Sequence, residues 1–328
     1  MEPRRRYYLS NLIEDYLAAL QRRGRGTKGT ADDYRRELWR MLQGLDVANL
    51  ATTPAKIGED EIDYIMTEMY GDLKPKTVQW EVAIFSGWLQ FHKNMVVSRM
   101  MISWPTDNRI NVDWLSLDEL VVLLDAAKGT SRPMVHCASR LFMRRVEIKR
   151  LTMKDVYQGV LDVRGKGHGK GKWRTLAFAP ETYQVFAEWM GVRDAMIEEA
   201  QQFDQGVIVP EEFFIYRRQG HLYPYGDTGI DNRFHEAGEQ ANLARIVSGH
   251  RLRRSGARIA IQADPNNMQT LVEALGHVSE TQTRKYCGLT VDDMSLMHQS
   301  VSDLLETARE RMRISGARPM PPAMRMIR

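Results

Sequence analysis

The sequence predicts a mainly α-helical protein of two domains with one small antiparallel β-sheet, an α+β fold. Three observations predict it. Apolar residues recur at helical spacing through the first hundred residues, a proline-containing segment at 102–108 interrupts that pattern, and a glycine-rich segment later joins two short β-type runs. With 328 residues, 43% of them hydrophobic, the chain is long enough for two domains that each bury a core.

The first domain, residues 1–107, is expected to be a small helical bundle. Helices are predicted at 9–22, 28–42, 59–70 and 75–97, with the polar, glycine-containing stretch 24–30 as the loop between the first two. In the last range Val78, Val82, Phe85 and Leu89 recur at spacings of three and four, and Pro75 suits a first helical turn. One face of this helix must therefore pack against its neighbours.

The second domain, residues 108–328, is expected to begin after the linker at 102–108, because proline disfavours helix at the preceding residue. Ser116 followed by Glu119 predicts a capping box that opens its first helix. Apolar residues at 160–163 and 173–178 flank the glycine-rich segment and predict a β-hairpin. From residue 180 onward only helices are expected, ending with an amphipathic helix at 291–312.

The charge distribution indicates a polyanionic partner. The net charge is +4, yet residues 140–174 hold eleven Lys or Arg against three acidic residues. Residues 245–258 hold five Arg and no acidic residue. Charge focused in this way is typical of nucleic-acid-binding surfaces, although solvated basic faces share the pattern.

Several classes of protein are not favoured. No apolar run approaches the length that crosses a bilayer, and the N-terminal segment is amphipathic, so no membrane association and an intracellular protein are expected. Cys137 and Cys287 lie far apart without metal-ligand spacing, so no disulfide framework and no metal site are expected.

The glycine-rich stretch VRGKGHGKGKWR, residues 163–174, has three interpretations: a nucleotide-binding loop, a solvated basic turn, or a turn that carries one lysine to a phosphate. A Walker loop needs Ser or Thr after its Gly-Lys pair, whereas Trp173 follows the late pair here. Nucleotide binding is therefore not favoured, and no cofactor is expected.

A second set of motifs suits metal-free chemistry at a phosphodiester. His250-x-x-Arg253 is followed by Leu275-Gly276-His277 and by Tyr286, and Arg144 with Glu147 lies upstream. Tyrosine supplies a nucleophile, arginines bind non-bridging oxygens bidentately, and histidine and lysine move protons.

In this order the motifs resemble the catalytic domain of the tyrosine recombinase (phage integrase) family, over about residues 112–312. The resemblance implies a helical SAM-like core-binding domain and a tyrosine recombinase catalytic domain that form a C-shaped clamp. It assigns the nucleophile to Tyr286 and a supporting role to Glu147. The implied catalytic set is Arg144, Lys166, His250, Arg253, His277 and Tyr286. The sequence departs from the family in having Phe142-Met143 where Gly-Leu is usual, which puts the local backbone in question.

The assignment of the general-acid lysine stays open between three positions. The Gly-Lys-Gly context favours Lys166, but the interval to Arg174 is about three residues longer than the family pattern, so Lys170 or Lys172 are alternatives. Basic residues around the site are expected to bind DNA. They are Arg145, His168, Lys170, Lys172, Arg174, Arg251 and Arg254.

The resemblance further implies a site-specific recombinase that cleaves and rejoins DNA through a 3′-phosphotyrosyl intermediate and a Holliday junction, without metal or cofactor. Integration or excision of a mobile element, or resolution of a replicon, are the expected roles. The partners would be double-stranded DNA with inverted-repeat core sites and, on DNA, three further copies of the chain, which would be a monomer or weak oligomer when free. The helix at 291–312 would dock on a neighbouring protomer or pack in cis.

Two alternative functions remain at this point: a type IB topoisomerase-like enzyme, and a catalytically silent DNA-binding regulator of the same fold. The expected location is the cytoplasm in association with the nucleoid, or the host-cell cytoplasm for a viral protein.

Overall fold

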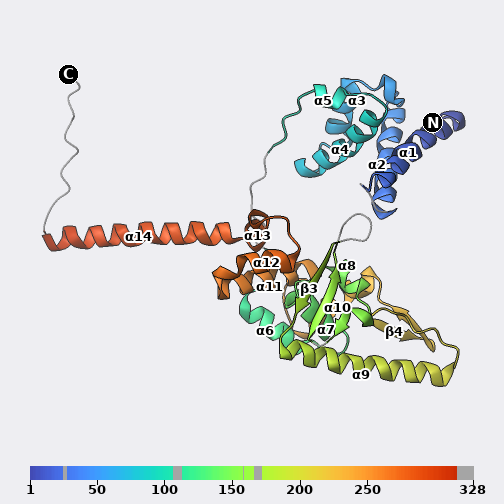
Figure 1. Ribbon diagram of the computed structural model, residues 1–328. Coiled ribbons are helices and arrows are strands. Elements are labelled where there is room, and N and C mark those ends of the chain that lie inside the picture. The colour runs from blue at the N-terminus through green and yellow to red at the C-terminus, as the bar shows by residue number, and fades with distance from the viewer. Residues whose placement is uncertain (25–27, 106–112, 158, 166–171, 316–328) are drawn as a thin grey trace. The chain divides into compact units, whose positions relative to one another are not determined.

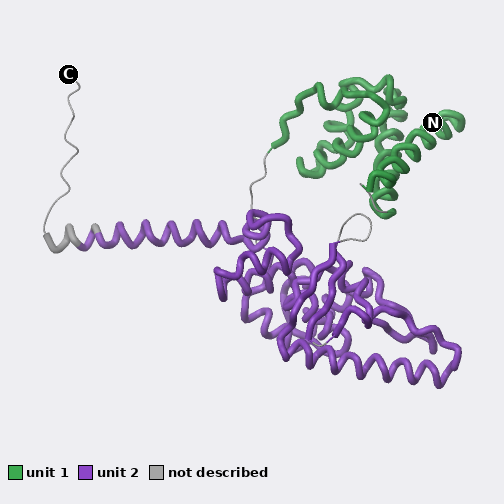
Figure 2. Tube along the Cα trace, viewed as in Figure 1, with its two compact units in different colours: residues 1–109, 166–171 green, residues 110–165, 172–328 purple. Residues whose placement is uncertain are grey.

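The structure is a computed structural model that describes residues 1–24, 28–105, 113–157, 159–165 and 172–315. Three predicted site residues, Lys166, His168 and Lys170, lie outside the described residues. The chain divides into two compact units (Figure 2). Of the described residues, unit 1 holds those up to residue 105, and unit 2 holds those from residue 113 onward.

Unit 1 is helical, as the apolar spacing predicts. Its helices are α1 (Pro3–Arg22), α2 (Lys28–Val47), α3 (Glu59–Tyr64), α4 (Pro75–Phe91) and α5 (Val96–Arg99), with a 3₁₀ turn η1 (Pro54–Lys56) and a π turn η2 (Ile65–Met69). One apolar core joins them. It includes Leu9, Ile13, Leu38, Met41, Phe85 and Trp88, all buried.

Two predicted helices of unit 1 end earlier than expected. The helix predicted over 59–70 leaves α-geometry at Ile65 and continues as the π turn. The helix predicted over 75–97 ends at Phe91, because Lys93 takes a left-handed φ of +65°. Asn94 then donates side-chain hydrogen bonds to the carbonyls of Pro54 (2.7 Å) and Ile57 (2.8 Å). These tertiary bonds turn the chain before α5 begins.

Unit 2 contains nine α-helices and five strands among its described residues (Figure 1). The helices are α6 (Leu117–Ala126), α7 (Ser131–Ser139), α8 (Arg145–Arg150), α9 (Pro180–Phe203), α10 (Asp227–Gln240), α11 (Gly249–Ala263), α12 (Met268–Leu275), α13 (Glu280–Cys287) and α14 (Leu289–Ser315), with 3₁₀ turns η3 (Met153–Asp155) and η4 (Pro265–Asn267). The strands are β1 (Val156–Tyr157), β2 (Val160–Arg164), β3 (Trp173–Ala177), β4 (Ile215–Arg218) and β5 (His221–Pro224). None of the described helices of either unit has the length and apolarity of a bilayer span.

The predicted capping box at the start of α6 is confirmed. The Ser116 hydroxyl accepts from the Glu119 amide (3.1 Å), and the Glu119 carboxylate accepts from the Ser116 amide (2.7 Å). Two amide groups at the helix start are thereby satisfied.

The predicted β-hairpin is confirmed as β2 and β3, which pair antiparallel with Leu161 opposite Leu176 and Val163 opposite Arg174. The short strand β1 adds to its edge, giving the order β1-β2-β3. Because side chains alternate along a strand, Leu161 and Val163 face the core.

The expectation of helices alone after residue 180 is wrong, because β4 and β5 form a second antiparallel hairpin. Its two-residue turn, Gln219-Gly220, has φ values of +51° and +80°. Such a turn matches the twist of two paired strands, and glycine adopts it without steric cost. The tyrosines Tyr216 and Tyr223 stack across the hairpin with ring centroids 5.7 Å apart.

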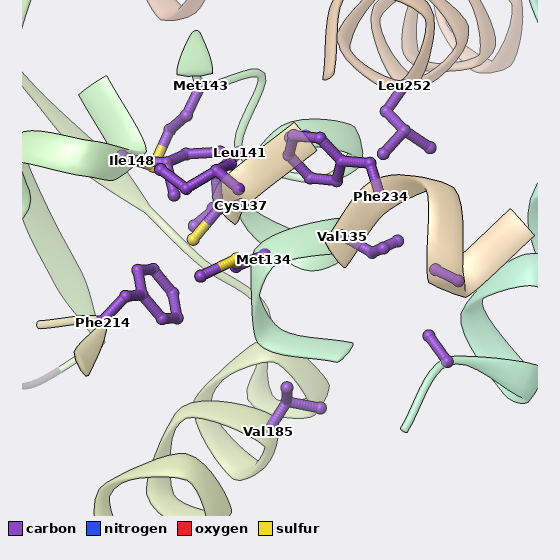
Figure 3. Close-up of a cluster of buried hydrophobic side chains, with 14 of the residues drawn as sticks. Met134, Val135, Cys137, Leu141, Met143, Ile148, Val185, Phe214, Phe234 and Leu252 are labelled. Carbon is purple, nitrogen blue, oxygen red and sulfur yellow. The ribbon is translucent and has the colours of Figure 1, made fainter. Parts of the chain in front are cut away.

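The core of unit 2 is built around α7, whose residues are almost all buried. Figure 3 shows Met134, Val135 and Cys137 of α7 in the buried cluster, together with Phe234 of α10 and Leu252 of α11. The helix α11 approaches α7 so closely that a Cβ atom at Gly256 would overlap the carbonyl oxygen of Ser139. This contact fixes α11, the helix that carries His250 and Arg253, against the core.

Candidate active site

Glu147 is the buried centre of an arginine cluster. Its carboxylate, on α8, is fully buried and accepts a bidentate pair of hydrogen bonds from Arg174 of β3 (3.0 and 2.9 Å). It also accepts from the Arg144 guanidinium (2.9 Å) and the Arg144 backbone amide (2.7 Å). An Arg253 nitrogen lies 3.7 Å from the same carboxylate. One side chain thus holds three guanidinium groups that the sequence places far apart.

The electrostatics of the cluster favour an anionic ligand. Burial by itself raises the pKa of Glu147, but the hydrogen bonds and charge of Arg174, the Arg144 amide and the charge of Arg253 together hold the pKa below its ordinary value. Glu147 is therefore ionised at neutral pH. Three cations against one anion leave a net positive site, which suits a phosphodiester.

Arg253 is held by backbone carbonyls from two elements. Its side chain is 2% exposed and donates to the carbonyl of Phe142 and to that of Leu275 (2.5 Å). Burial, followed by the nearby charge of Arg144, lowers the pKa of Arg253 to about 10. The guanidinium is still charged at neutral pH, and its position is set by the chain fold.

The unusual Phe142-Met143 dipeptide has a structural consequence. Phe142 has φ +50°, in the left-handed region that glycine adopts without strain and that costs a bulky residue about 1–2 kcal/mol. Its carbonyl nevertheless accepts the hydrogen bond from Arg253. The backbone therefore takes a glycine-type conformation although the residue is phenylalanine.

The end of α12 supplies a second set of contacts to the arginines. Gly276 ends the helix with φ +60°, again left-handed, as is usual after a helix C-terminus. The carbonyl of Ala274 accepts from Arg174 Nε (2.8 Å), and the carbonyl of Leu275 accepts from Arg253. Cations at the negative end of the helix are favourable. The Leu275-Gly276-His277 motif thus orients Arg253 as well as carrying a histidine, and the residue before it orients Arg174.

Tyr286 lies among these groups on α13. Its ring is 5.3 Å from that of His250 and 5.2 Å from that of His277, both in edge-to-face geometry, and the Arg254 guanidinium carbon lies 5.2 Å from the ring centre. The buried hydroxyl forms no hydrogen bond within the described residues. Burial raises the pKa of Tyr286, and the charges of Arg253 and Arg254 oppose that rise. The hydroxyl is protonated at neutral pH, so attack requires proton loss during the reaction.

Both histidines are neutral at pH 7. Burial and then the charges of Arg254 and Arg253 lower the pKa of His250. Burial and the charge of Arg253 lower the pKa of His277 to about 4. The Nδ1 atom of His277 lies 2.9 Å from the Thr283 hydroxyl. A neutral imidazole has one donor and one acceptor nitrogen, so each ring can donate one hydrogen bond or accept one proton.

The structure thus brings together most of the residues that the sequence singles out. They are Arg144, Glu147, Arg174, His250, Arg253, Arg254, His277 and Tyr286. Arg174, predicted as a DNA contact, is 13% exposed and has donors committed to Glu147 and Ala274. A bracing role follows directly from these contacts, and a DNA contact stays a prediction.

Three other residues that the sequence predicts as DNA contacts are not part of this cluster. Arg145 pairs with Asp231 and Asp227 of α10. Arg251 donates from Nε to Asp113 (2.7 Å). Lys172 is exposed, and its carbonyl accepts from the Gly165 amide (2.8 Å). Their binding to DNA remains a prediction.

Sequence reasoning missed Thr283 and the carbonyls of Phe142, Ala274 and Leu275. Backbone carbonyls carry no sequence signal. Thr283 has a weak one, since it lies three residues before Tyr286 and so on the same side of a helix.

Comparison with known proteins identifies relatives of this chain. The model of the phage integrase family matches residues 113–292. The tyrosine recombinase XerC of Vibrio cholerae serotype O1 is 22% identical over 204 residues, which are 60% of this chain and 60% of that protein. XerC of Vibrio atlanticus is 26% identical over 195 residues, 57% of this chain and 58% of its own. The matches thus span about 60% of the length of these curated relatives.

Solved structures share the fold. A fragment of lambda integrase, solved as a dimer bound to a COC′ core site, has a TM-score of 0.61 at 16% identity and covers 85% of this chain and 94% of its own. The Tn1549 transposon integrase in complex with transposon right-end DNA has a TM-score of 0.62 at 16% identity, covering 84% of this chain and 94% of its own.

Proposed function

Because the chain belongs to the phage integrase family, we propose that it is a site-specific tyrosine recombinase that cleaves and rejoins DNA through a 3′-phosphotyrosyl intermediate. One observation carries the proposal. The Tyr286 ring packs edge-to-face against the rings of two neutral histidines, and its hydroxyl is buried. The charge of Arg253 acts on this hydroxyl, and Arg253 shares Glu147 with Arg144 and Arg174. A nucleophile, proton acceptors and phosphate-binding cations are therefore in one cluster.

In the proposed reaction, Tyr286 Oη attacks the scissile phosphorus. A P–Oη bond forms, the P–O5′ bond breaks, and the 5′-oxygen takes a proton from a lysine of the β2–β3 segment. The phenolic proton passes to His250, which is neutral and therefore able to accept it. Arg144 and Arg253 bind the non-bridging oxygens, whose charge grows in the transition state. The 5′-hydroxyl of a partner strand reverses these steps.

The proposed substrate is double-stranded DNA with inverted-repeat core sites, exchanged through a Holliday junction by four copies of the chain. A solved lambda integrase tetramer is bound to a Holliday junction, which supports this assembly for a protein of the same fold. The proposed roles are integration or excision of a mobile element, or resolution of a replicon, and the proposed location is the cytoplasm, with the nucleoid or in an infected host.

The covalent intermediate tests the proposed function. The probe is a nicked duplex carrying the inverted repeat found in DNA that co-purifies with the protein or flanks its gene, because the nick lets the cleaved fragment diffuse away and traps the adduct. We expect a denaturant-resistant protein–DNA adduct, with the DNA attached to the peptide that contains Tyr286. The Tyr286→Phe variant should bind the duplex and form no adduct.

Other outcomes would support the alternatives. Tight binding without any adduct in the wild type indicates a catalytically silent regulator. Relaxation of supercoiled plasmids that lack the repeat indicates topoisomerase-like activity. An adduct that persists in Tyr286→Phe contradicts the assignment of the nucleophile.

The helix α14 is the proposed contact between copies. It extends away from the rest of unit 2 as one helix of 27 residues (Figure 1). Five of its apolar side chains share one face and are 49–71% exposed, so the part of the chain that the structure describes leaves them largely uncovered. They are Met294, Met297, Val301, Leu304 and Leu305. An exposed apolar stripe of this length favours docking on a protein surface, and we propose that the surface belongs to another copy.

Leu304→Glu should weaken assembly on DNA at least about tenfold, because a charge replaces a methyl-rich contact in an apolar interface. Binding to a single half-site should be unchanged. Ser302→Glu is the matched control, since it adds the same charge about 160° away from Leu304 around the helix. Mass photometry of the protein on one half-site measures binding, and mass photometry on paired full sites measures assembly. Tetramers of Leu304→Glu at wild-type concentration would argue against the proposed role of α14.

A further inference from the structure

We infer that Thr283 is a positioning residue, whose hydroxyl fixes the tautomer of His277 so that Nε2 carries the hydrogen and donates it to the scissile phosphate. That the Nε2 hydrogen is donated to a scissile phosphate rests on the proposed function. The tautomer of His277 does not, because it can be measured in the protein without DNA. No sequence motif used above points to Thr283.

The contact between the two side chains is short and buried. Thr283 is 0% exposed, and its Oγ1 lies 2.9 Å from His277 Nδ1. A buried hydroxyl without a partner costs free energy, so this group must use its hydrogen. The second acceptor within reach is the Ser279 carbonyl, at 3.4 Å.

The distances favour the His277 ring as the acceptor of this hydrogen. Hydroxyl hydrogen bonds lie between about 2.5 and 3.0 Å, so the Ser279 contact is long and the His277 contact lies inside the range. Thr283 has a single hydroxyl hydrogen, and we assign it to Nδ1, the nearer of the two acceptors, since the Ser279 carbonyl already accepts from the Thr283 amide (3.3 Å). An Nδ1 atom that accepts a hydrogen bond is unprotonated, and the ring hydrogen of a neutral imidazole is then on Nε2.

The groups around His277 keep its imidazole neutral, so that the ring has a single hydrogen on one of its two nitrogens. The low pKa of the ring keeps it neutral at pH 7, because burial and the charges of Arg253, Arg144 and Arg174 disfavour a further cation. A cationic ring would donate from both nitrogens whatever Thr283 did. The His277 amide also donates to the Val272 carbonyl (3.0 Å), which holds the backbone next to the ring. The neutral ring thus has one hydrogen, and Thr283 determines its place.

The opposite tautomer would be unfavourable for catalysis. With the hydrogen on Nδ1, the unprotonated Nε2 would present a lone pair to a phosphate oxygen. That contact is repulsive, whereas an Nε2–H group stabilises the charge that develops on the oxygen. Partners that orient a functional histidine through its other nitrogen commonly contribute about 10- to 100-fold to activity in metal sites, and we expect an effect of that order here.

Three variants test the inference. Thr283→Val keeps the shape and removes the hydroxyl, and Thr283→Ser restores it. Thr182→Val is a matched control, because Thr182 is a buried threonine whose hydroxyl lies 3.2 Å from Nδ1 of the buried His136, in the core of unit 2. It deletes the same kind of hydrogen bond at a histidine that the proposed mechanism does not use.

Two measurements separate positioning from a merely structural role. Long-range ¹H–¹⁵N NMR spectra of the histidine rings, with His277 assigned by a His277→Gln variant, report the tautomer in free protein. Single-turnover adduct formation on the nicked duplex at saturating protein reports the chemical step. We expect Nε2–H in the wild type and Thr283→Ser, and partial or complete Nδ1–H in Thr283→Val with cleavage slowed about 10- to 100-fold. Thr182→Val should cleave at the wild-type rate.

The inference is overturned if wild-type His277 carries its hydrogen on Nδ1, or if Thr283→Val changes neither the tautomer nor the cleavage rate. Failure of the proposed function looks different. In that case the wild type forms no adduct, while the NMR spectra still report the tautomer that Thr283 imposes.

Discussion

Glu147→Gln is expected to lower the free energy of unfolding by about 3–5 kcal/mol, the range for breaking a buried ion pair by removing one partner. The amide would leave Arg144, Arg174 and Arg253 without the one carboxylate that they share. Adduct formation should fall about 10²–10³-fold, because the arginines then repel each other and lose their fixed geometry. Denaturant unfolding and single-turnover cleavage measure the two effects.

The pH dependence of unfolding gives a second test of Glu147. Its pKa in the folded protein is below the ordinary value of 4.5, so its stabilising contribution is complete above that value and is lost as the pH falls through the lowered pKa. The wild type should therefore lose more stability than Glu147→Gln on acidification below about pH 4.5.

Glu181→Gln provides a matched control for Glu147→Gln. Glu181 pairs with Arg140 at 2.9 Å on the surface, where removal of an ion pair costs at most about 1 kcal/mol. Arg174→Lys keeps the charge next to Glu147 and loses the bidentate geometry, so it should fold more stably than Glu147→Gln and still cleave slowly. Wild-type stability and cleavage in Glu147→Gln would refute the role of Glu147 as the centre of the cluster.

Lys166→Ala is expected to slow cleavage of ordinary DNA by about 10²–10⁴-fold, the contribution of a general acid. A 5′-bridging sulfur in the substrate should restore the rate, because a thiolate leaves without a proton. Lys170→Ala and Lys172→Ala should cleave normally at saturation, bind more weakly, and reduce the slope of log affinity against log salt by about one each.

The rescue pattern identifies the acid among the three lysines. Rescue of Lys170→Ala or Lys172→Ala by the sulfur, in place of Lys166→Ala, would show that the three additional residues of this segment precede the functional lysine. Tyr286→Phe should stay inactive on both substrates, because sulfur substitution changes the leaving group and not the nucleophile.

Most helices of the fold are predictable because their signals are local. The spacing of Val78, Val82, Phe85 and Leu89 predicts a buried helix face, and all four are buried. The β4–β5 hairpin had a local signal too, the Gln219-Gly220 pair between two short runs that contain aromatic and aliphatic residues, but strands of four residues are easily lost between long helical patterns. The end of α4 had no local sequence signal, because Asn94 turns the chain there by donating hydrogen bonds to carbonyls about 40 residues away.

The sequence by itself determined the fold class, the positions of most helices and the residue types of the candidate site, since periodicity, caps and short motifs such as His250-x-x-Arg253 depend on neighbours in the chain. Only the tertiary structure decided which groups touch. Arg174 meets Glu147 across 27 residues, and Arg253 meets the Phe142 carbonyl across 111. Such contacts depend on packing between elements, and backbone carbonyls and buried hydroxyls such as that of Thr283 acquire their role only when packing brings a partner to them.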